Sequence, residues 1–466
     1  MSAEPSPREN LNKLFGDFVS HEEALIAADA RRNLRNMRES LRLLVLVLIV
    51  SGAMGAAAWA FLASLDAVTG FRERHAAVFL LLPVVSIATA WLYRRFGKEA
   101  ARGNNLVIES ALTERSVPAR MAAMTFTCSV ATHLAGGSAG REGTAVQIGG
   151  TIADNVARLV RLGARDHQDL MLAGISAAFG AVFGAPLAGT FFGMEMCYVG
   201  KINYSSGIYC LIASFTADTV CRALGCTHAS YVIGAVPELE APTVALAVIF
   251  AIVFGLTARL FSLAIRTVRR VLAHRITNYL VAALAGSLAL LAAYFIFGIQ
   301  RYAGLSTWLV EEGFAGDTTL ADPFIKIALT ALTLGTGFQG GEVTPLFGIG
   351  ASLGGVLGSL VGIPCAFAAA LGMLGVFGSA LNVPITTIML GVDLFGGAAM
   401  PYFVIVAFVS YLVAGHRGVY PAQRIVTPKR RSLASDANST VADAIARHNQ
   451  QDTNTEEANA KQQLAR

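Results

Sequence analysis

The sequence predicts an all-α, polytopic transmembrane protein built from two repeats, on the strength of three observations. Hydrophobic residues make up 54% of the 466-residue chain and charged residues 14%, whereas a soluble protein carries about 25% charge. Several apolar segments approach the roughly 20 residues that cross a bilayer. A motif of glycine, glutamate and threonine at Glu142 returns at Glu342. A soluble protein is therefore disfavoured.

Ten apolar segments are candidate membrane spans. Four are long and uninterrupted: Leu43–Ser64, Ala76–Tyr93, Ala241–Ile265 and Tyr279–Ile299. Six are shorter or broken by glycine: Ser176–Tyr198, Ile208–Val220, Ile325–Phe338, Leu346–Val361, Cys365–Ala380 and Tyr402–Ala414. Broken segments at membrane depth must be buried in protein or line a cavity, because lipid cannot satisfy free backbone groups. This pattern favours a transporter or channel over a receptor.

The flanking segments predict the domain organisation. Residues 1–40 are polar and lack a signal peptide; we expect an amphipathic helix over Asn10–Arg42. Basic residues beside the first span and after the last predict cytoplasmic termini. We therefore expect a cytoplasmic segment over 1–40, repeats over 41–235 and 236–425, and a disordered cytoplasmic tail over 426–466, which is rich in polar residues.

Composition argues against several other functions. The net charge of +5 reflects the flanking loops and requires no nucleic-acid partner. The six cysteines lie mostly in apolar segments and are predicted to be buried small hydrophobes, since the Cys221–Cys226 spacing matches no common zinc or redox signature. His133 is predicted to sit at a helix end with a backbone partner. We expect no metal and no cofactor.

Comparison of the chain with itself reveals the repeat. Residues 140–150 read GREGTAVQIGG and residues 340–350 read GGEVTPLFGIG. Further matches follow each motif: Gly174, Phe179-Gly180 and Pro186 in one half, and Gly372, Phe377-Gly378 and Pro384 in the other. A carboxylate stands nine residues after each proline, at Glu195 and Asp393. Such self-similarity indicates a duplicated unit, and inverted repeats with broken helices and a midplane site recur in transporters.

The two glutamates are candidate functional residues. Each stands where a loop enters a helix N-terminus inside the membrane, where free N–H groups and the helix dipole attract anions. An ionised carboxylate would occupy that site and would leave it on protonation, so Glu142 would be both gate and proton carrier. The alternative is a glutamate that caps its own helix or pairs with Arg141. An ionisable residue within a membrane favours the functional interpretation for Glu142 and Glu342; Glu195 and Asp393 may equally serve as helix-end groups.

These motifs resemble the CLC chloride channel and transporter family over about residues 40–425. Gly140–Thr144 followed by Val146–Gly150 is similar to the gating-glutamate motif, Phe183–Gly189 to a second signature, and Tyr420 stands where the family keeps an anion-facing tyrosine. The resemblance implies inverted repeats, a homodimer with one pathway per subunit, and an anion site that includes Gly140, Arg141 and Gly143 around the gate.

Three departures from the chloride-type pattern resemble the bacterial fluoride/proton antiporter branch. Gly103-Asn104-Asn105-Leu106-Val107 replaces Gly-Ser-Gly-Ile-Pro, Thr144 replaces proline, and Glu342-Val343-Thr344 replaces a phenylalanine-bearing turn. In that branch the second glutamate and its threonine lie near the central anion. Chloride/proton exchangers also keep an internal glutamate where this chain has Met196.

Fluoride is small and strongly hydrated, so dehydration requires close hydrogen-bond donors. The Asn104 amide, N–H groups near Val343 and Thr344, and the Tyr420 hydroxyl are candidate donors, although Asn104 may instead cap a helix. The sequence thus predicts a fluoride/proton antiporter in the cell (inner or plasma) membrane. The alternatives are a chloride or broad anion channel and a chloride/proton exchanger. An enzyme is disfavoured, because the spans carry no nucleophile–base or paired metal-ligand pattern.

Overall fold

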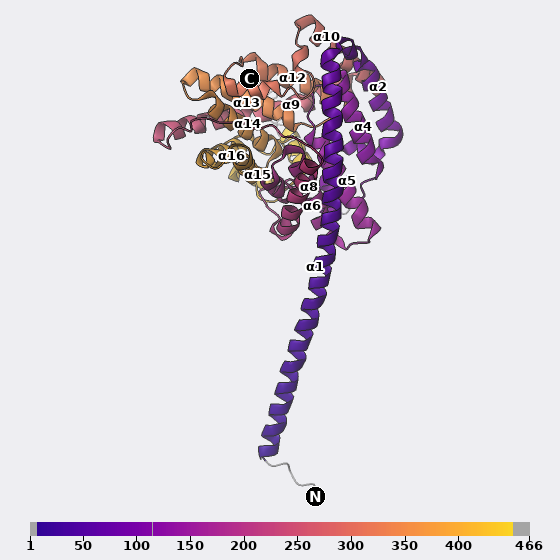
Figure 1. The fold of residues 1–466 in the computed structure, drawn as a ribbon, viewed down its shortest axis with the longest axis vertical. Helices are drawn as coiled ribbons and strands as arrows, with labels where there is room; N and C mark the ends of the chain where they lie inside the picture. Colours follow the sequence, from indigo (N-terminus) through magenta and orange to yellow (C-terminus); the bar gives the residue numbers. More distant parts are fainter. Residues whose placement is uncertain (1–6, 114, 451–466) are drawn as a thin grey trace, which may run out of the picture. The chain divides into compact units, whose positions relative to one another are not determined.

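The computed structural model describes residues 7–113 and 115–450, with side chains from Met37 onward. Helices make up most of this part of the chain, which confirms the predicted all-α class (Figure 1). The first half contains α1 (Pro7–Arg74), α2 (Leu82–Leu92), α3 (Asn104–Thr113), α4 (Arg120–Ala135), α5 (Glu142–Leu159), α6 (Ala164–Phe183), α7 (Pro186–Glu195) and α8 (Gly207–Ala223). The second contains α9 (Ala241–Arg275), α10 (Tyr279–Phe297), α11 (Trp308–Ala315), α12 (Ala321–Gly335), α13 (Val343–Val361), α14 (Cys365–Leu381), α15 (Pro384–Phe395) and α16 (Met400–Ala414).

Shorter elements join these helices. They are the 3-10 or π helices η1 (Ala76–Leu81), η2 (Tyr93–Gly97), η3 (Lys98–Arg102), η4 (Tyr204–Ser206), η5 (Gln300–Tyr302) and η6 (Arg431–Asp436), and the strands β1 (Tyr198–Val199) and β2 (Arg424–Ile425). The predicted repeat boundary at residue 235 falls in residues 224–240, which connect α8 to α9. The amphipathic character predicted for residues 10–36 lies outside the described side chains.

Five helical stretches of the described chain are long and apolar enough to cross a membrane. Three contain the long predicted segments: Met37–Arg74, Ala76–Arg102 and Ala241–Arg275. A fourth, Tyr279–Phe297, ends two residues before the predicted Tyr279–Ile299. The fifth, Val343–Val361, extends a segment that glycines had made look broken. It is more deeply buried in the protein than the other four, in agreement with its small residues.

The two repeats meet at the loops that precede α5 and α13. Gly140 and Gly341 form an isolated antiparallel bridge, in which the Gly140 N–H donates to the Gly341 carbonyl at 2.6 Å and the Gly341 N–H donates to the Gly140 carbonyl at 2.7 Å. Each strand of this bridge leads directly into the helix that carries its glutamate motif. The antiparallel pairing of related loops agrees with the predicted inverted repeats.

Repeated glycines allow two related helix crossings. In α13 and α14, a Cβ at Gly350 would lie 2.2 Å from the Gly372 carbonyl oxygen, and one at Gly372 would lie 2.1 Å from the Gly350 oxygen. In α5 and α6, a Cβ at Gly149 would lie 2.4 Å from the Gly174 oxygen. Helices that touch through their backbones need small residues at the crossing. The sequence matches at Gly174 and Gly372 therefore reflect packing.

Two expectations differ from the structure. The predicted disorder is wrong for residues 426–450: η6 and a helix over 441–450 are hydrogen-bonded, and Val441 and Ala444 pack against Val199 and Tyr411. These apolar side chains are too few to stand out in a polar segment, but they suffice to dock it. Residues 451–466 lie outside the described part.

The second difference concerns the cysteines. Cys221 and Cys226 form a disulfide, because the turn that ends α8 brings the two side chains together. The prediction of a small buried hydrophobe is therefore wrong for this pair. It holds for Cys128, Cys197 and Cys210, which are free and buried.

We expect Gly350→Ala to destabilise the protein, because its methyl group would overlap the Gly372 carbonyl. Overpacking costs about 1–3 kcal/mol, which thermal unfolding in detergent would detect as a lower midpoint. Gly70→Ala is the matched control, since a Cβ there meets nothing within 4 Å. An unchanged midpoint for Gly350→Ala would contradict the close crossing.

Candidate anion site

Glu142 opens α5, yet its carboxylate bonds to the N-terminus of α13. The Thr344 N–H donates to Oε2 at 3.1 Å and the Thr344 hydroxyl donates to Oε1 at 2.5 Å. On its own side, the Arg141 N–H donates to Oε2 at 3.1 Å, and Arg141 Nε lies 3.5 Å from Oε1. Only 2% of the residue is exposed. The carboxylate thus occupies the anion-attracting end of the other repeat's helix, and the pairing with Arg141 that was the alternative interpretation is also present.

Unpaired polar atoms gather around the second glutamate. Glu342 Oε2, Asn104 Oδ1 and the Tyr420 hydroxyl are buried and have no hydrogen-bond partner among the described residues. A Cβ at Gly143 would lie 2.9 Å from Asn104 Nδ2 and 3.1 Å from Glu342 Oε2, so these groups face one small space that only glycine leaves open. Tyr420 also interacts electrostatically with both glutamates. Since buried polar atoms are normally paired, this space fits a small polar ligand.

The predicted site residues do not all contribute in the same way. Asn104, which begins α3, lies with Glu342 beside Gly143, and Tyr420 lines the same cavity as Asn104 and Glu342. Thr344 contacts Glu142 directly, and Val343 is the first residue of α13. The Gly140 N–H, in contrast, is taken by Gly341, so its backbone donor is not free for an anion.

Sequence reasoning missed a polar chain beside the site. The Thr125 hydroxyl donates to Gln147 Oε1 at 2.6 Å, and the Tyr93 hydroxyl lies 2.9 Å from the Thr125 hydroxyl. Gln147 Nε2 stands 3.3 Å from the place where a Cβ of Gly103 would lie, next to Asn104. The available signal was Gln147 itself, a polar residue inside the apolar run that follows Glu142.

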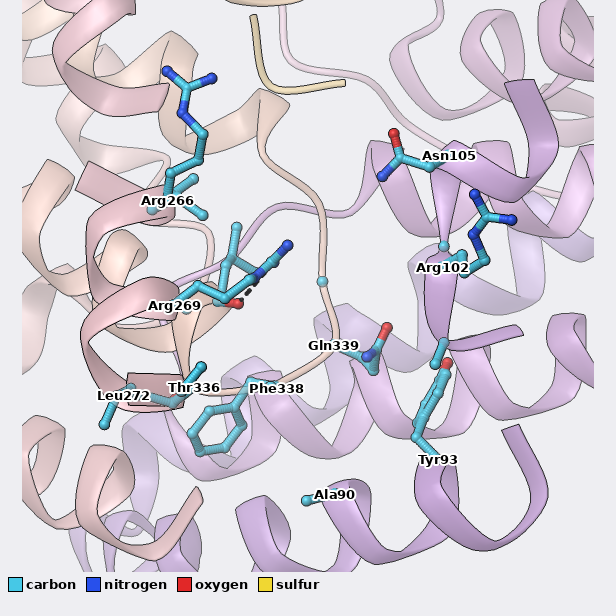
Figure 2. A pocket seen from close by; sticks show the side chains of 18 of the residues that line it. Ala90, Tyr93, Arg102, Asn105, Arg266, Arg269, Leu272, Thr336, Phe338 and Gln339 are labelled. Carbon is cyan, nitrogen blue, oxygen red and sulfur yellow. Dashed lines mark hydrogen bonds between the residues drawn. The ribbon is translucent and has the colours of Figure 1, made fainter. Parts of the chain in front are cut away.

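Two cavities approach the glutamates. The larger, of about 930 Å³, reaches Glu342, Asn104 and Tyr420. Its basic lining residues are Arg94, Lys98, Arg102, Arg266 and Arg269, and Glu342 is the one carboxylate among its lining residues. Figure 2 shows Arg266, Arg269 and Arg102 around this cavity. Such a lining attracts anions.

The smaller cavity has a volume of about 550 Å³ and reaches Arg141, which contacts Glu142. Its lining is mixed, with Arg72 and Arg301 beside Asp66, Glu73 and Glu311. A row of neighbouring residues therefore connects the basic cavity to the smaller one: Glu342, Gly143, Glu142 and Arg141.

Comparisons with known proteins agree with this geometry. Residues 84–415 match the family model described as voltage gated chloride channel. The chain is 40% identical over 389 residues to the chloride/fluoride channel protein of Pseudomonas syringae pv. tomato, covering 82% of this chain and 86% of that one. A crystal structure of a CLC-type fluoride/proton antiporter superposes with a TM-score of 0.81 at 35% identity, over 83% of this chain and 98% of that one. A slow cyanobacterial Cl-/H+ antiporter shares the fold at 18% identity, with a TM-score of 0.70 over 80% and 94% of the two chains.

Glu195 and Asp393 form a reciprocal pair of helix caps. Glu195, at the end of α7, accepts from the Ile385 N–H at 3.2 Å and the Thr386 N–H at 2.9 Å, at the start of α15. Asp393, near the end of α15, accepts from the Ala188 N–H at 2.8 Å, at the start of α7. Of the two interpretations left open for this pair, the geometry supports the helix-end one.

We expect Glu195→Gln to lower stability, because a neutral amide cannot replace a charged acceptor for both N–H groups. Hydrogen bonds to charged groups contribute about 1.5–3 kcal/mol, so the thermal midpoint in detergent should fall while proton coupling stays intact. Glu238→Gln, at an exposed loop carboxylate, should change neither. Lost coupling with an unchanged midpoint would mean that Glu195 carries protons.

Proposed function

The chain belongs to the voltage-gated chloride channel (CLC) family of transport proteins, and from this membership we propose that it is an antiporter that exports fluoride in exchange for protons. The observation that carries the proposal is the meeting of two buried glutamates with the Asn104 amide nitrogen, which faces Gly143, and the unpaired Tyr420 hydroxyl. A single space thus offers both a proton-carrying carboxylate and hydrogen-bond partners for a small anion.

Glu142 couples the two substrates by competition. While ionised, its carboxylate holds the Thr344 N–H and hydroxyl. Protonation removes its charge and weakens these bonds, so the carboxyl swings away and an anion takes its place at the N-terminus of α13. Return of the carboxylate expels the anion and releases the proton. Anion and proton therefore exchange at one position.

Fluoride selectivity comes from the number and closeness of donors. Fluoride gives up its hydration water only where short hydrogen bonds replace it. The Tyr420 hydroxyl, the Asn104 amide and, when protonated, the Glu342 carboxyl surround the space that Gly143 leaves open. Groups this close suit a small anion better than chloride. Met196, which cannot bind a proton, supports the same choice over a chloride/proton exchanger.

The proposed orientation in the cell inner or plasma membrane places both termini and the basic cavity on the cytoplasmic side. Arg266, Arg269 and Arg270 near the end of α9 support this, since basic residues favour the cytoplasm. The Cys221–Cys226 disulfide supports an outer location for the end of α8, because disulfides persist in oxidising compartments. We further propose a homodimer in the bilayer, consistent with exposed apolar side chains on α8 such as Leu211 and Phe215.

Reconstitution in liposomes tests the function directly. With an imposed fluoride gradient, we expect protons to move against their own gradient, with much smaller fluxes for chloride. Glu142→Gln should abolish the coupling because its side chain cannot release a proton, whereas Asp317→Asn, at an exposed carboxylate, should leave it intact. Fluoride flux without proton movement would refute antiport, and equal chloride flux would refute the selectivity.

Glu342→Gln tests the second glutamate. The substitution keeps the shape of the side chain but removes its ability to ionise, so we expect coupled exchange to slow by about tenfold or more, which corresponds to about 1.4 kcal/mol of barrier. Fluoride and proton electrodes would measure both fluxes in the same vesicles. An unchanged exchange rate would reduce Glu342 to a helix-capping residue.

A further inference from the structure

The segment after α16 carries Tyr420 and then folds back onto the transmembrane helices. The family model stops at residue 415, so this segment lies beyond it. β2 pairs in parallel with β1 at the end of α7, and Ile425, Val441 and Ala444 pack against Val199 and Tyr411. We call residues 416–450 the clasp.

Within the clasp, the helix over 441–450 is bonded directly to the residues that follow Tyr420. The Ala442 N–H donates to the Pro421 carbonyl at 2.9 Å and the Val441 N–H to the Gln423 carbonyl at 2.9 Å. The first turn of the helix over 441–450 is therefore capped by the short segment that directly follows the tyrosine. Movement of this helix would move the Tyr420 backbone.

The same segment also contacts the start of α3, beside Asn104. The Ala422 N–H donates to Asn105 Oδ1 at 3.1 Å, one residue from Asn104. The Gln423 amide donates to the Leu381 carbonyl at 2.7 Å and to the Met196 carbonyl at 2.9 Å. Two candidate anion ligands thus depend on one docked strand.

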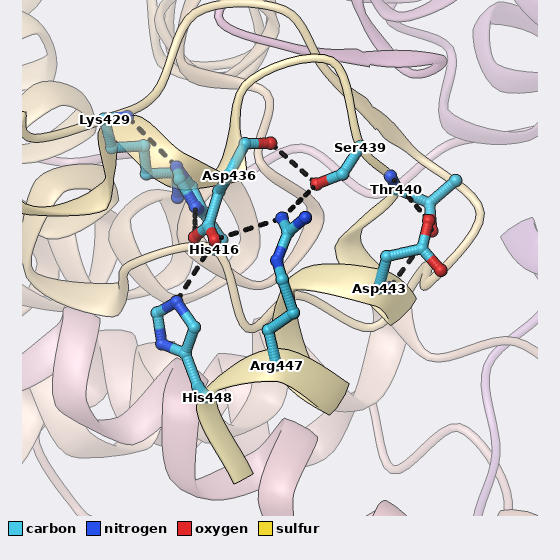
Figure 3. A network of polar contacts seen from close by, with 8 residues as sticks. All are labelled: His416, Lys429, Asp436, Ser439, Thr440, Asp443, Arg447 and His448. Atoms are coloured by element: carbon cyan, nitrogen blue, oxygen red, sulfur yellow. Dashed lines mark hydrogen bonds and ion pairs between the residues drawn. The ribbon is translucent and has the colours of Figure 1, made fainter. Parts of the chain in front are cut away.

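A buried carboxylate joins the far parts of the clasp. Asp436 is fully buried and lies 2.8 Å from His416 Nδ1, 3.1 Å from His448 Nε2 and 3.4 Å from Arg447 Nη2. Figure 3 shows these three side chains converging on Asp436. Removal of one partner from a buried charged network is costly, because it leaves the remaining charge uncompensated.

The hydrogen bonds of His416 require a neutral ring. Its Nε2 accepts from the Lys429 N–H at 3.0 Å, so the ring proton is on Nδ1 and is donated to Asp436. Protonation of Nε2 would turn this acceptor into a donor that faces the Lys429 N–H, and the hydrogen bond would be lost. Lys429, whose Nζ donates to Asn382 Oδ1 at 2.6 Å, and His448 further disfavour a positive charge on the ring.

The pH dependence follows from these contacts. Burial lowers the pKa of His416, against the opposing effect of its bond to Asp436. Below the ordinary histidine pKa of about 6.5, an undocked His416 takes up a proton that the docked ring does not. Docking is therefore fully stable above this pH and is weakened as the pH falls.

Asp436 and Asp443 do not titrate in this range. Burial alone would raise the pKa of Asp436, but the bonds from His416 and His448 lower it overall. The bonds from Thr440 lower the pKa of Asp443. Both carboxylates stay ionised near neutrality, which leaves the two histidines bonded to Asp436, His416 and His448. Of these two, His416 is the one whose second ring nitrogen accepts a backbone N–H, that of Lys429, and therefore the one whose docked contacts require a neutral ring.

We propose that the clasp positions Tyr420 at the anion site and that it loosens when the solution on its own side is acidified, with His416 as the sensor and Asp436 as a positioning residue. The role of Tyr420 rests on the proposed function, whereas the docking and its pH response do not.

Hydrogen–deuterium exchange of the full-length protein tests the pH response without any transport assay. After correction for intrinsic rates, exchange in peptides from residues 426–450 should rise severalfold between about pH 7.5 and about pH 5.5, the range in which histidine titrates. His416→Asn retains a donor for Asp436 but cannot titrate, so its exchange should not depend on pH. His274→Asn, at an exposed histidine, should behave like the wild type. Flat wild-type exchange, or an unchanged slope in His416→Asn, would overturn the sensor.

Fluoride efflux from liposomes tests the positioning role. Asp436→Asn should raise the fluoride KM severalfold and reduce the pH dependence on the clasp side, and Asp436→Glu should restore part of both. Asp317→Asn should match the wild type. If Asp436→Asn undocks the clasp by exchange but leaves KM and the pH profile unchanged, the positioning role is refuted. If the wild type transports no fluoride while its exchange responds to pH as predicted, the proposed function fails and the sensor stands.

Discussion

The structure depends on the meeting of two helix N-termini inside the protein. α5 and α13 begin on either side of the Gly140–Gly341 bridge, where their first N–H groups have no partners within the helix. In a low-dielectric interior such groups must be satisfied. The Glu142 carboxylate accepts from the Thr344 N–H at the start of α13. Because the two loops approach each other closely, both need glycine at the bridge. The same constraint that holds the repeats together therefore creates the anion site.

Glu195 and Glu142 both cap the N-terminus of another helix, but their surroundings differ. Glu195 accepts from Ile385 and Thr386, including the Thr386 hydroxyl at 2.8 Å, and none of the unpaired groups of the anion site adjoins it. Glu142 has a similar set of donors, but it borders the unpaired groups of Glu342 and Tyr420 and lies between two cavities. These surroundings are why we propose a gating role for Glu142 and a capping role for Glu195.

The clasp links the proposed anion site to a segment that follows the last transmembrane helix. The Tyr420 hydroxyl lies among the glutamates, yet the strand after it is held by a helix and by a buried aspartate some distance along the chain. The positions of the candidate ligands thereby depend on the buried His416–Asp436 pair of the clasp.

The sequence by itself determined the helical membrane class, the duplication and the two glutamates, because hydropathy, span length and recurring motifs are local properties. It also pointed to residues that the fold brings together at the proposed site, since Asn104 and Glu342 adjoin Gly143 and line one cavity with Tyr420. Only the tertiary structure decided that Glu142 bonds to α13, that Gly140 has no free N–H, and that Glu195 and Asp393 cap each other's helices. It alone revealed the folded clasp and the Cys221–Cys226 disulfide. These depend on contacts between residues far apart in the chain or on the geometry of a single turn, and neither composition nor periodicity records them.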